Sequence, residues 1–491
     1  MRFFVRTSFV VLERRRGAIL IPVLVFGGIA FLMTTALFQL GVSNIRLSRQ
    51  TIERERGLQS AEAGIDYYRW HLAHAPSDYQ DGTGGPGPYV HEMKDKDGTV
   101  IGTYTLDITP PPVGSTIVRM RSTGRMNTQP NRPRAIEVTL GIPSLANYAV
   151  VADDVMRFGV GTEIFGPIHS NEGIRFDGLA HNRVSSSRAS YDDPDHTGLP
   201  EFGVHTHVAP VDPLPPAAVP PRPDVFEAGR ELSVPDIDFA GLSGDLAQMK
   251  TDAQNGGRYY APSGALGYRL LLKTNDTFDL YRVNTLVPPP SGCTNSANQT
   301  GWGTWSINTQ TFLQNVAFPA NGIIFVEDHV WVEGTIDDAR LTIASGRFPD
   351  LPSTRTNIIV NNDLRYTNTD GTDVLGLIAQ GNFNVGMVSD TDLRIDGALV
   401  AQNGRVGRHY YRPPGGGFPR CSPYHVRQIL TLLGMIATNQ RYGFAYTDGT
   451  GYQTRNINYD SNLRFGPPPS FPLTGDQYEV LSWEEIATAG N

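Results

Sequence analysis

The sequence has few cysteines and few charges for its length. Its 491 residues include only two cysteines, Cys293 and Cys421, too few for a disulfide framework or a zinc site made of thiolates. Charged residues make up 18% of the chain and the formal net charge is -8, so the overall charge does not favour nucleic acid as a partner. The sequence also lacks a G-x-S-x-G nucleophile motif, a phosphate-binding loop and a dinucleotide fingerprint. These absences argue against several large classes of enzyme and against DNA-coating proteins.

Glycine and proline are abundant by comparison, with 52 and 36 residues. This composition favours turn-rich β structure over helical bundles, and a chain of this length is expected to contain more than one core. We therefore predict an α+β fold that is mainly β.

Charge is absent from a long stretch near the start of the chain. No charged residue lies between Gly17 and Ile45, and the apolar run from Ala18 to Val42 exceeds the roughly 20 residues that cross a bilayer. Residues 1–17 are rich in arginine, so the positive-inside rule predicts a cytoplasmic basic leader and an exported remainder. A cleaved secretory signal is the alternative, but its apolar core has only about 7–15 residues. The pattern predicts a single-pass membrane protein.

The helical pattern continues beyond the apolar run. Residues 43–74 contain no proline, and apolar side chains recur there at steps of three and four, which places them on one face of an α-helix. We predict one transmembrane and amphipathic helix over residues 18–75, with this face buried against a sheet or against neighbouring subunits. The residues of this face, called the packing stripe below, are Leu58, Ala61, Ile65, Tyr68 and Leu72.

The start of the chain resembles a known family. The basic residues, Gly17, the apolar span and the sequence Ala61-Glu62-Ala63-Gly64 resemble the N-terminus of PilX-like minor pilins and related pseudopilins of type IV pilus assembly. The resemblance implies that a prepilin peptidase cuts between Gly17 and Ala18. The fifth residue after that cut is Pro22, where major pilins carry a glutamate, so the resemblance points to a minor subunit.

Two kinds of β structure are expected after the helix. Alternating apolar residues over 89–141 predict a small antiparallel sheet, and a long helix packed on such a sheet is what pilin heads look like. Farther along, six related segments combine a short apolar strand with a polar corner, some following one another at about 20 residues, as in solenoids. We predict a β-solenoid over 147–178 plus 320–445. The residues expected to stack in one inward-facing column are Ile324, Ile359, Ile378, Leu399 and Ile436.

Two segments do not follow this period. Residues 180–320 include a stretch from Ala209 to Pro223 in which seven of fifteen residues are proline, and we predict that they form an inserted proline-rich side subdomain. Residues 446–491 are predicted to form a C-terminal tail.

A histidine-rich segment is the first candidate for chemistry. The H-x-H pair His205 and His207 could bind a metal ion with neighbouring histidine and aspartate residues, but the spacing specifies no fourth ligand. We interpret the segment as a solvated polar loop and expect no metal and no cofactor. The residues considered are Asp192, Asp193, Asp195, His196, His205 and His207.

Acidic and aromatic residues in the repeats are further candidates. The acidic residues could bind calcium or act as general acids, as on β-helical polysaccharide-acting enzymes. The aromatic residues could stack on sugars. We interpret the first as ordinary corner residues and the second as packing residues, and assign no catalytic residue. The acidic set is Asp337, Asp338, Asp390, Asp392 and Asp396, and the aromatic set is Trp302, Trp305, Tyr410 and Tyr411.

The function that the sequence favours is structural. We expect a minor pilin or pseudopilin-like component that displays a β-rich head for adhesion or tip contact, and not an enzyme. The expected partners are other pilin subunits, prepilin peptidase, the lipid bilayer and a surface ligand. A membrane-anchored polysaccharide-acting enzyme and a signal-anchored surface protein are the alternatives. Because disulfides persist in exported proteins, we also predict a bridge between Cys293 and Cys421, although their spacing does not show that they meet.

Overall fold

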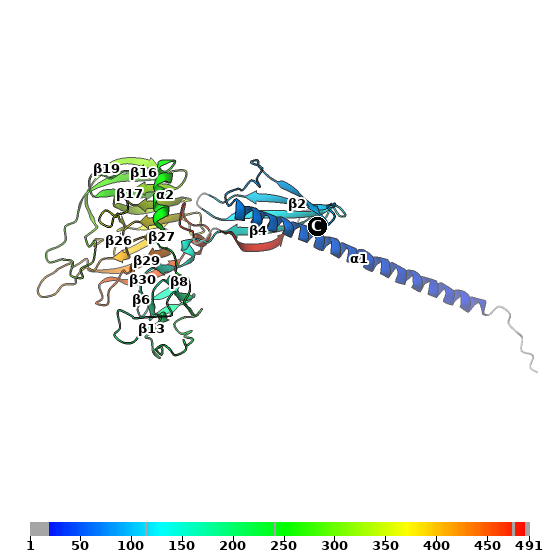
Figure 1. The fold of residues 1–491 in the computed structure, drawn as a ribbon, viewed down its shortest axis with the longest axis horizontal. Coiled ribbons are helices and arrows are strands. Elements are labelled where there is room, and N and C mark those ends of the chain that lie inside the picture. Colours follow the sequence, from blue (N-terminus) through cyan, green and yellow to red (C-terminus); the bar gives the residue numbers. More distant parts are fainter. Residues whose placement is uncertain (1–18, 113–114, 240–241, 474–476, 487–491) are drawn as a thin grey trace, which may run out of the picture.

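The computed structural model describes residues 19–112, 115–239, 242–473 and 477–486. A long helix leads into a small sheet, and a larger β-rich head, residues 142–473, lies beyond that sheet (Figure 1). The fold is therefore mainly β with one long helix, which confirms the predicted fold class.

Helix α1 (Leu20–His74) is continuous over its whole length. Pro22 lies in its first turn, where the missing backbone N–H is tolerated. The helix ends before Pro76, and the backbone N–H of Ala75 donates to the carbonyl of His71 at 2.8 Å. Within the described ranges, α1 is the one helix long and apolar enough to cross a membrane, and its apolar half is exposed.

The small sheet is antiparallel. Its strands β1 to β4 follow α1 in the chain, and β31 comes from the C-terminal segment. The head is inserted between its last two strands, so the C-terminal segment returns to the sheet that carries α1 (Figure 1). In spatial order the strands are β1 (Tyr89–Lys94), β2 (Val100–Thr109), β3 (Val118–Met126), β4 (Arg134–Gly141) and β31 (Glu479–Ile486).

The head is built around a ladder of short parallel strands, called the main ladder below. The spatial order of these strands differs from their order along the chain. From one end of the ladder to the other they are β16 (Arg258–Tyr260), β20 (Ile323–Val326), β22 (Arg340–Ser345), β25 (Val374–Ala379), β27 (Asp392–Ala401), β29 (Val426–Thr438), β5 (Val150–Ala152), β8 (Ile168–Ser170), β11 (Val184–Ser186) and β15 (Arg230–Leu232).

Further parallel strands complete the coils of this solenoid-like stack, and an antiparallel pair follows β17 at one end. One series is β17 (Gly267–Lys273), β21 (Val330–Ile336), β23 (Ile358–Ile359), β26 (Phe383–Val385) and β28 (Val406–Arg408). Another joins β24 (Leu364–Tyr366), β27, β29, β30 (Gly451–Tyr459), β7 (Glu163–Phe165) and β10 (Leu179–Ala180). A third is β6 (Met156–Phe158), β9 (Ile174–Phe176) and β14 (Val204–His205), and the antiparallel pair is β18 (Thr277–Leu286) and β19 (Ile307–Ala317).

The chain enters the main ladder in its middle. It runs from β5 to β15 at one end, crosses to β16 at the other end, and returns to β29, which pairs with β5 (Figure 1). Helix α2 (Leu242–Gln254) lies on the crossing, and Leu246, Met249 and Ala253 cover an outer apolar face of the ladder.

Two predicted domain boundaries are therefore wrong. Residues 180–320 do not form a separate side subdomain, because β11, β15 and β16 extend the main ladder at both ends. Residues 446–491 are not a tail, because β30 pairs with β29 and β31 pairs with β4. These pairings join strands far apart in the sequence, and β11, β15 and β16 have only three residues each, too few to show an alternating pattern.

The predicted apolar column is correct only in part. Ile324, Leu399 and Ile436 lie in one column, together with Ile343 and Leu377. Ile378 is next to Leu377 and faces the opposite side, toward α2, because successive side chains of a strand alternate.

Ile359 belongs to another series, since it pairs with Trp331 of β21 and with Asn384 of β26. The repeats GLIAQ and ALVAQ align Leu377 with Leu399, so the predicted register was off by one residue at Ile378.

Candidate functional site

The packing stripe of α1 lies on the small sheet. Ala61, Tyr68 and Leu72 are fully buried, Ile65 is 4% exposed, and Leu58 is half-buried. The apolar side chains of the sheet in the same core are Leu106, Val118, Met120, Ile136, Val138 and Leu140. The C-terminal half of the helix is therefore fixed to the sheet, while the apolar half projects from it (Figure 1).

Small residues let the helix backbone approach strand β3. A Cβ atom on Gly124 would lie 2.5 Å from the backbone nitrogen of Ala61 and 2.9 Å from Cβ of Ser60. A Cβ atom on Gly64 would lie 2.8 Å from the ring of Tyr104. No side chain fits at either position without movement, so glycine sets the distance between helix and sheet.

Two of the four family-motif residues contact the small sheet, and the other two are partly exposed to solvent. Ala61 and Gly64 face the sheet, whereas Glu62 and Ala63 are half-buried. The processing residues Gly17 and Ala18 lie outside the described residues.

Hydrogen bonds join the two segments through which the chain enters and leaves the head, and one of them comes from the β2–β3 connection of the small sheet. The Ser144 hydroxyl donates to the carbonyl of Leu463 at 3.1 Å, and the Thr116 hydroxyl donates to the carbonyl of Phe465 at 3.1 Å. The backbone N–H of Leu145 donates to the carbonyl of Pro472 at 2.9 Å. The segment that leaves β4 therefore lies beside the segment that returns toward β31.

Cys293 and Cys421 form a disulfide bond, with their Cα atoms 4.7 Å apart. Near it, the fully buried Arg408 donates to the carbonyls of Met387 at 2.9 Å and Tyr424 at 2.6 Å. Burial lowers the pKa of Arg408 to about 10. The bridge joins the 409–425 loop to the 287–306 loop, and the guanidinium ties Tyr424 of the first loop to β28.

The histidine-rich segment is largely buried, which corrects the interpretation as a solvated loop. His205 is 1% exposed and Asp193 and Glu201 are each 5% exposed, while His207 is half-buried. These four residues, called the histidine–carboxylate cluster below, offer ligand-type atoms that all lie within 4.8 Å of one another. The burial arises because β12 (Ser190–Tyr191) pairs with β13 (Glu201–Phe202), and β14 pairs with β9.

Contacts within the cluster are short. Nε2 of His207 lies 2.9 Å from Oε1 of Glu201, and Nε2 of His205 forms an ion-pair contact with the same carboxylate. Nε2 of His205 also lies 3.6 Å from Oδ2 of Asp193. Burial lowers the pKa of His205, an effect that Glu201 and Asp193 partly oppose.

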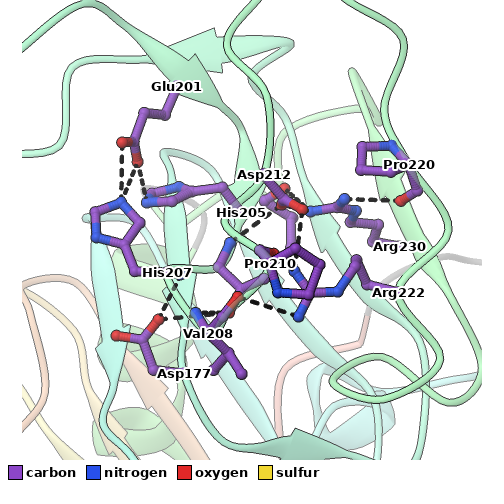
Figure 2. Close-up of polar contacts among 12 residues, drawn as sticks. Asp177, Glu201, His205, His207, Val208, Pro210, Asp212, Pro220, Arg222 and Arg230 are labelled. Atoms are coloured by element: carbon purple, nitrogen blue, oxygen red, sulfur yellow. Dashed lines mark hydrogen bonds and ion pairs between the residues drawn. The ribbon is translucent and has the colours of Figure 1, made fainter.

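A second group of charged residues holds the strand that bears the histidines. The backbone N–H of His207 donates to Asp177 at 2.8 Å, and the backbone N–H of Thr206 donates to Asp212 at 3.2 Å (Figure 2). Asp212 in turn forms ion pairs with Arg222 and Arg230. The two rings are therefore carried by a backbone that is fixed on both sides.

The sequence interpretation missed Glu201 and included three residues outside the cluster. Asp192 is exposed, Asp195 pairs with Arg157 and Arg441, and His196 is exposed with Nδ1 3.2 Å from Glu201. The sequence did contain a pattern that points to Glu201. Positions 201, 205 and 207 are separated by even numbers of residues, and an extended chain places side chains with such spacing on the same side.

The acidic residues of the repeats do not converge. Asp396 is fully buried, pairs with Arg394 at 2.9 Å and accepts the backbone N–H of Tyr366 at 2.9 Å. Asp392 is exposed, and Asp390 accepts from Asn362 at 3.3 Å.

The other acidic pair has a similar structural role, since Asn368 donates to both Asp337 and Asp338 at 3.1 Å. These contacts give the acidic residues roles in holding corners.

Two of the aromatic candidates, Trp302 and Tyr411, lie in the apolar cluster that contains the disulfide. Tyr411 is 1% exposed, and Trp302 packs against it with ring centroids 6.1 Å apart. Trp305 is half-buried beside Trp331, and the hydroxyl of Tyr410 donates to Asp448 at 2.7 Å. They pack the rim of the head.

The chain has a weak structural likeness to a known protein. No family model matches the sequence, and no curated protein does. Among solved structures, the chain is similar to the competence-associated pilin ComZ from Thermus thermophilus, with 13% identity, 88% of this chain and 97% of that chain covered, and a TM-score of 0.31. A likeness at this score and identity is too weak to establish a shared fold or function.

Proposed function

We propose that the chain is a minor pilin or pseudopilin-like structural subunit of a type IV pilus or a related assembly system. The observation that carries the proposal is the division of α1 into two halves. Its exposed apolar half suits a bilayer or the apolar core of a filament, and its second half is buried on a small antiparallel sheet. Because the helix is continuous, its apolar half and the small sheet are rigidly connected.

The head is the part that such a subunit would display. It is inserted between β4 and β31, so its two connections to the small sheet lie side by side and it can be large without altering the helix. We infer that it serves adhesion or contact at a filament tip through a surface ligand. The apolar half of α1 fits a single-pass anchor with its N-terminus in the cytoplasm and the head exported.

The test is to produce the full chain in cells that assemble type IV pili and have prepilin peptidase. We expect a mature N-terminus at Ala18 by intact-mass measurement and the chain in the sheared filament fraction. Retention of Met1, together with confinement to the membrane fraction, would contradict the proposal. Turnover of a polysaccharide by the purified chain would favour the enzyme alternative instead.

A matched pair of variants tests the packing stripe in the same cells. Ile65→Asp places a charge in the buried contact between helix and sheet and should abolish incorporation into filaments. Asp66→Asn changes the exposed neighbouring residue and should leave incorporation unchanged.

A further inference from the structure

We propose that the histidine–carboxylate cluster is a structural binding site for one zinc ion, with Asp193, Glu201, His205 and His207 as its four ligands. The site lies at the β13 end of the head, far from α1 in the fold (Figure 1). The inference is independent of a role in a pilus.

Two distances within the cluster are close to those between ligands of a tetrahedral ion. Nitrogen and oxygen ligands lie about 2.0–2.1 Å from zinc, so two ligands of a tetrahedral site are separated by about 3.3 Å. The distances of 2.9 Å between His207 and Glu201 and 3.6 Å between His205 and Asp193 lie on either side of this value. In Figure 2 the rings of His205 and His207 both point toward the carboxylate of Glu201.

Unsatisfied buried atoms provide the second observation. Among the described residues, Nδ1 of His205 is buried without a hydrogen-bond partner, and neither Nε2 of His205 nor Oδ2 of Asp193 forms a hydrogen bond, although Nε2 is in ion-pair contact with Glu201. Buried polar atoms without hydrogen bonds are costly, and a cation between Nε2 of His205 and Oδ2 of Asp193 would accept a lone pair from each of these two atoms.

Charge around the cluster also favours a cation. Among the described residues, Arg175 is the one arginine that pairs with these two carboxylates, and its guanidinium is shared, because Nη1 lies 3.7 Å from Asp193 while Nε donates to Asp177 at 2.8 Å. A divalent ion would balance the two carboxylates.

The ligand types are compatible with zinc, and the small space points to a structural role. Two imidazole nitrogens suit zinc or another transition metal, whereas calcium takes six to eight oxygen ligands. The cavity against Glu201, His205 and His207 has a volume of only about 10 Å³, so it has no room for a substrate. With all four positions filled by the chain, the ion would tie the 192–200 loop to β13 and β14.

The test uses the full chain purified in detergent, stripped with a chelator and dialysed. Titration with zinc chloride, followed by metal analysis, should give one ion per chain, and the stripped protein should melt at a lower temperature than the zinc-loaded protein. Cobalt(II) should give the strong visible absorption of a four-coordinate ion. Absence of binding at millimolar zinc, or binding of calcium but not zinc, would overturn the proposal.

Variants test the identity of the ligands. His207→Gln changes a half-buried ligand, and the control His74→Gln changes an exposed histidine of α1, outside the head. We expect zinc affinity to fall at least tenfold in the first and to stay unchanged in the second, with circular dichroism showing that both are folded. Glu201→Gln serves as a second ligand variant if His207→Gln does not fold. Equal affinities in the ligand variant and the control would overturn the assignment.

Discussion

At the residue scale, Gly124 of β3 controls how closely α1 approaches the sheet. A methyl group there would meet the backbone of Ala61, which cannot rotate away. We expect Gly124→Ala to destabilise the chain by roughly 1–3 kcal/mol, the usual cost of overpacking a core. Thermal unfolding of the purified chain measures the effect. Gly85→Ala is the matched control, since a Cβ atom there meets open space, and equal losses in the two variants would contradict the explanation.

A buried histidine makes the head sensitive to acid. Burial, together with the charges of the nearby Arg405 and Arg408, lowers the pKa of His409 from 6.5 to about 3. Because the unfolded chain takes up a proton that the folded chain refuses, stability contributed by neutral His409 falls as the pH drops from about 6.5 toward 3. The slope is at most about 1.4 kcal/mol per pH unit.

His409→Asn should therefore make the loss of stability between pH 6.5 and pH 5 shallower. Denaturant unfolding at a series of pH values measures this slope. The exposed His74 provides a control, because His74→Asn should leave the slope as it is. An unchanged slope in His409→Asn would show that His409 is protonated in the folded head.

At the scale of the element, the main ladder depends on its apolar column. Leu399 of β27 is fully buried between Leu377 and Ile436. Leu399→Ala leaves a cavity in this column and should cost about 2–5 kcal/mol. Asp392→Ala, at the exposed first residue of the same strand, should change stability by no more than about 0.5 kcal/mol. Thermal melts of both variants test the difference, and similar melting temperatures would be inconsistent with a packed column.

At the scale of the whole molecule, the small sheet is completed only when the chain returns from the head. Truncation after residue 473 removes β31 and leaves the edge of β4 unpaired along Ala135–Gly141. We expect faster amide hydrogen exchange and proteolysis in β4 and α1, with little change in the main ladder, because the two parts have separate cores. Truncation after residue 486 keeps β31 and is the control. Uniform loosening of both parts would instead indicate one cooperative unit.

The elements that the sequence alone determined are those whose formation depends on residues close together in the chain. Steps of three and four in Ala61, Ile65, Tyr68 and Leu72 define one helix face, and Pro76 limits where that helix can end. Alternation over residues 89–141 and the recurring apolar strands likewise indicated a mainly β fold, which the structure confirms.

The histidine–carboxylate cluster could be predicted only in part. His205 and His207 stand out as a pair, but Glu201 contributes only because β13 pairs with β12 and brings it beside Asp193. Burial of the cluster depends on the strands that surround it, and no local pattern reports such burial.

Only the tertiary structure decided the order of the strands and the partner of each face. The pairing of β29 with β5, the return of β31 to β4 and the disulfide between Cys293 and Cys421 all join residues far apart in the chain. The sequence determined which segments are strands. It did not determine their partners, because a short apolar strand can pair with many others. The competition for buried surface in the folded chain determined which strands meet, because the free energy of burial depends on all neighbours at once.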